Sequence, residues 1–250
     1  MIALTAIKEK IRRKDLYIVG MIGLVLVLLF CSGGGTITID GEPISGFANL
    51  APLMLTLINI LSGALAITLS IRTIPNEYER RTSHLIWIRG VKQWKYHAEL
   101  AIANVISSLI AAAIMYLGLL VLAVVKNQGN GIERMIPAFW VLAISITIVS
   151  IVSSVLSIFL PSLAAGILAV GIFGVGILHS ILEIAANTIG GLSGNLLKVV
   201  LAILPNLHEI QKQAGNLMGG SVIDAHVIWK GLLTIYILSL GFFIFQKKEA

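Results

Sequence analysis

Long runs without charge dominate the chain and recur along its length. The longest are residues 50–71, 100–125, 138–160 and 162–182, with shorter runs at 16–30 and 231–245. Each long run meets or exceeds the ~20 residues that a helix needs to cross a bilayer core of ~30 Å. Polar and apolar residues do not alternate along them, as they would in a membrane barrel. Because lipid cannot satisfy backbone groups, these runs are predicted to be helices.

The pattern predicts one all-α membrane domain over residues 1–250, with six spanning helices. The expected spans are approximately 15–31, 47–73, 98–125, 136–160, 162–185 and 225–246. Residues 1–14 precede the first span, and there Leu4, Ile7 and Ile11 repeat at helical spacing opposite basic residues. That stretch is typical of an amphipathic helix lying in the membrane interface.

Composition supports the membrane assignment and excludes an ordinary water-soluble domain. The chain is 57% hydrophobic and 12% charged, with a mean hydropathy of +0.96. Soluble domains are closer to a quarter charged, and 250 residues could not bury this much apolar surface in one or two cores. We therefore expect membrane lipid as its surroundings and no nucleic-acid partner. The single cysteine excludes a disulfide within the chain.

The basic residues predict an orientation. With six spans, 13 of the 18 Lys and Arg residues fall on the side that holds both termini, and five fall on the other side. Basic residues favour the cytoplasmic side of short loops. The expectation is a multi-pass protein of a bacterial cell membrane with both termini in the cytoplasm.

One polar stretch, PNEYERRTSHLIWIRGVKQWKY at 75–96, interrupts the apolar runs between the second and third spans. Glu77 and Glu79 would lie near the positive end of a helix that begins here, and Trp87 gives that helix an apolar side. A connector that merely obeys the charge rule is one interpretation. A helix that docks on a cytoplasmic partner is the other.

This stretch resembles the corresponding loop of ABC-transporter permeases of the type-2 export family. Glu77, Thr82 and the apolar run 85–88 fit that family's pattern, whereas Arg81 stands in place of its Gly and Glu99 in place of its Lys. The layout is also similar, with an amphipathic N-terminal helix, six spans and a long outer segment before the last span. Within that segment, LPNLHEI at 204–210 resembles a Pro-containing segment of the family.

The resemblance implies that 75–96 contains a cytoplasmic coupling helix, seated in a cleft of an ATPase subunit. The residues that would make this contact are Glu77, Glu79, Arg80, Arg81, Thr82 and Trp87. The chain has no G-x-x-x-x-G-K-[ST] sequence, so ATP and Mg would be bound by separate ATPase chains, in two copies. A second permease chain, in a homodimer, completes the expected assembly. The implied cargo is an amphipathic peptide or a hydrophobic compound, and this chain would hold no catalytic residue and no cofactor.

The outer segment, residues 186–224, is predicted to form short re-entrant or interfacial helices. Gly190, Gly191 and Gly194 interrupt the helical pattern, and residues 195–204 are too few to cross a membrane. The resemblance implies that these helices plug the outer leaflet between two permease chains and form the exit for cargo.

Polar residues within the predicted spans suggest few sites. Ser150, Ser153, Ser154 and Ser157 form a dense row on the fourth span, which indicates either helix packing or the lining of a substrate path. His179 and Glu183 could pair at i, i+4. No metal site is predicted, since Asp224 and His226 lack a third ligand.

Two other classes of protein remain as alternatives. GLSG at 191–194 matches the G-x-S-G of rhomboid proteases, which would make Ser193 a nucleophile and His226 its base. The serine, however, begins a segment too short to span. A secondary transporter is the third class, disfavoured because the spans carry no central charges and show no inverted repeat.

Overall fold

The protein is described by a computed structural model that covers residues 2–12, 20–25, 38–39, 42–43, 47–79, 90–125 and 132–244. The described part is helical apart from two short antiparallel strands, β1 (Thr38–Ile39) and β2 (Glu42–Pro43). The all-helical class predicted from the sequence is therefore confirmed.

Ten helices of this part have defined bounds. They are α1 (Ile2–Arg12), α3 (Phe47–Ile71), α4 (Thr73–Glu79), α6 (Gln93–Val125), α7 (Ile132–Phe159), α8 (Ser162–Ile177), α9 (His179–Ile189), α10 (Gly191–Ile203), α11 (Leu207–Met218) and α12 (Ala225–Ile244). Four stretches of the described part are long and apolar enough to cross a membrane: Ala51–Glu79, Gln93–Val121, Ile132–Phe159 and Ala225–Phe243. The bent pair α8–α9 makes a fifth if counted as one span. These helices are compatible with a multi-pass membrane protein.

The first expected span, 15–31, is described only over residues 20–25, which are helical. This piece lies against α6. A Cβ added to Gly20 would be 3.5 Å from the Ile114 side chain, and one added to Gly23 would overlap Met115. The remainder of that expected span lies outside the described residues.

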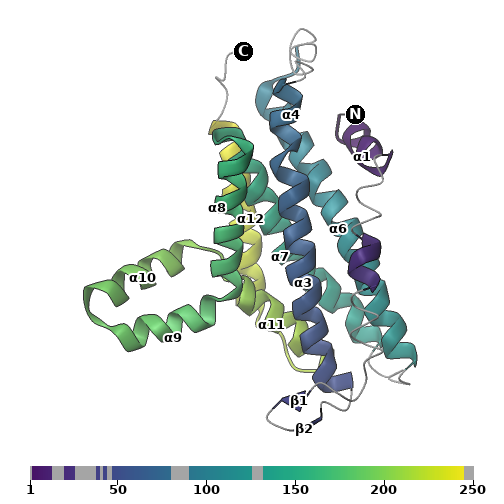
Figure 1. The fold of residues 1–250 in the computed structure, drawn as a ribbon, viewed down its shortest axis with the longest axis vertical. Coiled ribbons are helices and arrows are strands. Elements are labelled where there is room, and N and C mark those ends of the chain that lie inside the picture. The colour runs from purple at the N-terminus through teal and green to yellow at the C-terminus, as the bar shows by residue number, and fades with distance from the viewer. Residues whose placement is uncertain are drawn as a thin grey trace.

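Helix α7 forms the centre of the bundle and packs against α3, α6, α8, α11 and α12 (Figure 1). In the most apolar stretch of its candidate span, 78% of the residues are buried, compared with 11% in that of α12. A helix that is apolar on all sides is suited to the interior of a bundle, and α7 is apolar or carries only small hydroxyl side chains along most of its length. The core therefore forms around α7, and α12 covers it from one side.

The expected fifth span, 162–185, is wrong as a single straight helix. α8 ends at Ile177, and α9 leaves it at an angle of 75°. Gly174 and Gly176 precede the break and weaken the helix there. The absence of a side chain at Gly176 also allows the start of α11 to pack closely against α8. A Cβ at this position would lie 2.8 Å from the Leu207 side chain and 3.0 Å from the Pro205 carbonyl oxygen. The close packing of α11 thus accounts for the position of the bend.

The coupling helix predicted within 75–96 is not distinct from the second span over residues 76–79. α4 continues α3, and the two form one 29-residue candidate span ending at Glu79. Gln93 and the residues after it belong to α6. The predicted coupling loop, 75–96, therefore overlaps both helices at its ends, and residues 80–89 lie outside the described part.

A close contact between α3 and α8 leads to a stability prediction. The Phe173 ring lies where a Cβ on Gly63 would be, at 2.2 Å, whereas a Cβ on Gly171 of α8 would meet nothing within 4 Å. Since Phe173 is itself buried, we expect Gly63→Ala to lower the free energy of unfolding by about 2 kcal/mol relative to Gly171→Ala. Thermal unfolding of both purified variants in detergent measures this difference. Equal stability would mean that the two helices do not pack this closely.

Candidate functional site

The junction of α4 and α6 is the described part of the predicted coupling region. Tyr96 of α6 donates a hydrogen bond of 2.9 Å to the Glu77 carboxylate of α4, and the Tyr78 hydroxyl and His97 Nε2 share one of 2.8 Å. Tyr96 and His97 are almost completely buried. These contacts hold the end of α3–α4 to the beginning of α6, so the two helices meet the connector as one unit.

The predicted coupling residues fall into two groups. Glu77 turns toward Tyr96, and Glu79, the last residue of α4, is exposed. The remaining four, Arg80, Arg81, Thr82 and Trp87, lie outside the described residues. Sequence reasoning assigned Glu77 to a partner's cleft, but its carboxylate also has a partner within its own chain.

Asn104 is the centre of a buried polar cluster at the same end of the bundle. Its Nδ2 donates to Ser154 Oγ at 3.0 Å, and its Oδ1 accepts from Thr73 at 2.9 Å and from the Lys10 ammonium. Lys10 also donates to the Leu69 carbonyl oxygen of α3 at 3.3 Å. The cluster joins α1, α3, α4, α6 and α7.

Helix α1 is attached to this end of the bundle by a second contact. The Ala3 N–H donates to the Glu99 carboxylate of α6 at 3.2 Å. A carboxylate at the start of a helix satisfies an N–H that has no partner within the helix and is favoured by the helix dipole. Sequence reasoning counted Lys10 only among the basic residues that set the orientation and the polar side of the N-terminal helix, and noted Glu99 only as a departure from the family pattern. A charged residue within the first turns of an otherwise apolar span was the available signal.

The four serines of the predicted row, Ser150, Ser153, Ser154 and Ser157, face the interior of the bundle and are buried. Ser150 and Ser70 share a hydrogen bond of 3.1 Å, and Ser154 accepts from Asn104. Ser153 and Ser157 donate to carbonyl oxygens of their own helix. In this arrangement the hydroxyls form hydrogen bonds either to a neighbouring helix or to the backbone of α7 itself. A substrate could reach them only if α7 separated from α3 and α6.

A second polar chain extends from α7 to α11. Ser145 donates to Asn59 Oδ1 at 3.1 Å, and Asn59 Nδ2 donates to Gln211 Oε1 at 2.9 Å. Gln211 in turn contacts Thr56. Because Asn59 is about 18 Å along α3 from its first residue, α11 reaches well into the bundle. α11 therefore packs inside the bundle, and Asn206 caps it by accepting a hydrogen bond from the Glu209 N–H.

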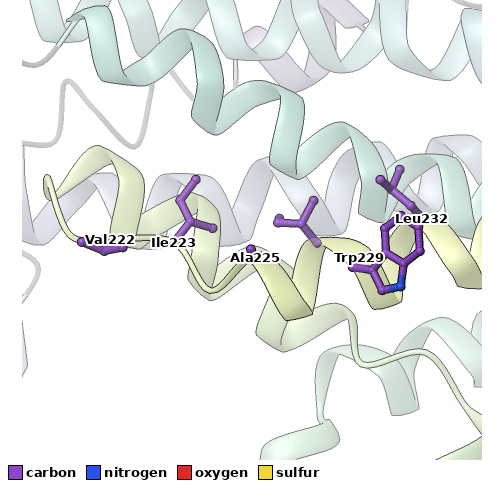
Figure 2. A pocket seen from close by; sticks show the side chains of 6 residues that line it. Val222, Ile223, Ala225, Trp229 and Leu232 are labelled. Carbon is purple, nitrogen blue, oxygen red and sulfur yellow. The ribbon is translucent and has the colours of Figure 1, made fainter.

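An open apolar groove of about 500 Å³ lies beside the beginning of α12 (Figure 2). Its walls are Val222, Ile223, Ala225, Ile228, Trp229 and Leu232. No charged side chain is among them, and the lining of the groove is apolar.

The other polar residues that the sequence suggested do not form a site. His179 Nε2 lies 3.2 Å from the Leu201 carbonyl oxygen, whereas Glu183 is exposed. Among the described residues, no three His, Cys, Asp or Glu side chains are placed to hold a metal ion. Ser193 is exposed on α10 and His226 on α12, and no hydrogen bond joins them in the described structure.

Comparison with known proteins adds no relative: no family model matches the chain, and no curated protein matches its sequence.

Proposed function

We propose that the chain is the permease subunit of an ATP-driven exporter of the ABC type, which moves amphipathic peptides or hydrophobic compounds out of the cell. Separate ATPase subunits supply the energy. The observation that carries the proposal is the joining of α3–α4 to α6 next to a strongly basic connector. Glu77–Tyr96 and Tyr78–His97 tie these helices together where the connector begins and ends. A partner that moves the connector would therefore move both helices together.

The proposed layout has six spans with both termini in the cytoplasm of a bacterial cell. The arrangement of the described helices supports it, because α1, α4 and the C-terminal end of α12 lie at one end of the bundle (Figure 1). Trp94 at the start of α6 stacks on Phe243 near the end of α12, with ring centroids 4.6 Å apart. Two such permeases, as a homodimer, would bind two ATPase chains.

Topology is tested with single cysteines in a Cys31→Ala background. Lys92 and Ser221 are both exposed and lie at opposite ends of the bundle. We expect a membrane-impermeant thiol reagent to label Ser221→Cys in intact cells and to label Lys92→Cys only after the cells are opened. The reverse pattern would invert the orientation and place the connector out of reach of any cytoplasmic ATPase.

The functional class is tested by purification from the native membrane. A tagged chain in mild detergent is expected to co-purify with a second polypeptide that carries a Walker A sequence and hydrolyses ATP. Purification of the chain without any ATPase, together with full transport activity, would contradict the proposal.

A further inference from the structure

Helices α9 and α10 form a hairpin that projects sideways from the bundle (Figure 1). The two helices approach closely, because a Cβ on Gly194 would lie 2.5 Å from the Ala186 carbonyl oxygen. Gly190 and Gly191 form the turn with positive φ angles of 59° and 61°, and His179 joins the base of the hairpin to Leu201. The hairpin is therefore one body, packed mainly on itself.

The hairpin has one polar face. His179, Glu183 and Asn187 repeat at i, i+4 and i+8 on α9, and Asn195 and Lys198 lie one turn apart on α10. A helix turns by about 100° per residue. Around each helix axis, the polar row is displaced in the same direction from the side of the helix that contacts the other helix. Since the helices are antiparallel, both rows come to the same face of the hairpin.

Most of the remaining hairpin surface is apolar and exposed. The large side chains on its outer edges are Ile181 and Ile184 on α9 and Leu192, Leu196, Val199 and Ile203 on α10, each at least 58% exposed. Both edges are apolar. A second protein chain docking on the hairpin would need only one apolar edge, whereas a fluid apolar medium would contact both.

The exposed apolar surface continues onto α8. Leu178 at the bend is 48% exposed, and Leu163, Ile167 and Val170 of α8 are exposed in turn. α8 has 16 residues, about 24 Å, so its end reaches the far leaflet of a ~30 Å bilayer core. The 75° bend then turns the hairpin close to the membrane plane if α8 crosses near the membrane normal.

We propose that the α9–α10 hairpin is a lipid-binding surface that lies in the bilayer interface. Its apolar edges contact acyl chains, continuous with the lipid-facing side of α8. Its polar face lies in the headgroup layer, where Lys198 complements the lipid phosphates. Amphipathic helices of this type bind membranes in the plane of the interface. The proposal requires only that the bundle spans a membrane, and it stands apart from the exporter assignment.

Spin labels test the proposal on the full chain in liposomes of phosphatidylcholine and phosphatidylglycerol. Nitroxides are attached to Ile184→Cys and Leu196→Cys on the edges and to Asn187→Cys and Asn195→Cys on the polar face, each in the Cys31→Ala background. Accessibility to oxygen reports lipid, and accessibility to a water-soluble nickel chelate reports water. We expect the ratio of the two accessibilities to be roughly tenfold higher at the edges than on the polar face.

Two reference positions calibrate the result. Trp140→Cys, on an exposed part of α7, represents lipid, and Ser221→Cys in the loop before α12 represents water. Low accessibility to both reagents at Leu196, with dipolar broadening between labels, would mean that a second copy covers the hairpin. High nickel accessibility at all four positions would place the hairpin in water. Either outcome overturns the proposal.

Discussion

The double substitution Glu77→Lys and Trp87→Ala is expected to lower co-purification of the proposed ATPase partner by at least about tenfold, because reversing a charge at a desolvated contact costs a few kcal/mol. Trp87 would supply the apolar anchor of the contact and Glu77 an anionic one. The measurement is the amount of ATPase recovered with the tagged chain from solubilised membranes, together with ATP hydrolysis in the membranes. Insertion of the chain should be unchanged, since both residues follow the apolar run 50–71 in the sequence.

The structure requires a control for this experiment. Because Glu77 accepts a hydrogen bond from Tyr96, Glu77→Lys disturbs the α4–α6 junction as well as any partner contact. Tyr96→Phe removes the same hydrogen bond and leaves the charge of Glu77 in place. We expect Tyr96→Phe to retain most of the ATPase. Wild-type recovery for the double variant would leave the connector without a docking role.

Asn104→Leu is expected to destabilise the protein by about 3 kcal/mol, since it removes three hydrogen bonds and leaves the buried Ser154 hydroxyl against an apolar side chain. The largest cost arises at Lys10, whose ammonium loses the Asn104 amide oxygen at the end of α3. Thermal unfolding in detergent measures the loss. The variant should also expose α1 to trypsin at Lys10 and Arg12, because Asn104 is one of its attachments to α6.

Ser107→Ala is the matched control for Asn104→Leu. Ser107 lies one turn away on α6, is completely buried, and its hydroxyl has no hydrogen-bond partner among the described residues. Removing an unsatisfied polar group should leave stability unchanged or increase it. If both variants unfold at the same temperature as the wild type, the Asn104 cluster makes no contribution to stability.

Much of the fold follows from the sequence, because lipid imposes a simple rule on it. Charge-free runs must be helices when no water can satisfy their backbone groups. The bounds of α3, α6, α7 and α12 lie within a few residues of expectation at most ends, and α1 begins as its apolar spacing predicts. The bend at Leu178 could not be predicted this way. Hydrophobicity continues past Ile177, and the break depends on how closely Leu207 of a distant helix approaches Gly176.

The candidate site was less predictable, because its contacts connect residues far apart in the chain. Lys10 and Asn104 are separated by 94 positions, and neither has a neighbour in sequence that indicates the other. The serine row of α7 was recognised, with packing and a substrate path both open. Its hydroxyls in fact contact Ser70, Asn104 and the backbone. Sequence spacing showed which residues share a helix face, but not which helix lies opposite.

Transport into inside-out membrane vesicles tests the central claim most directly. Vesicles that contain the chain and its ATPase are supplied with a fluorescent amphipathic peptide, with ATP and then with a non-hydrolysable analogue. The account predicts peptide accumulation that requires ATP hydrolysis and both chains, and that Ser193→Ala leaves unchanged. Accumulation that follows an ion gradient without the ATPase, or cleavage of the peptide that Ser193→Ala abolishes, would contradict it.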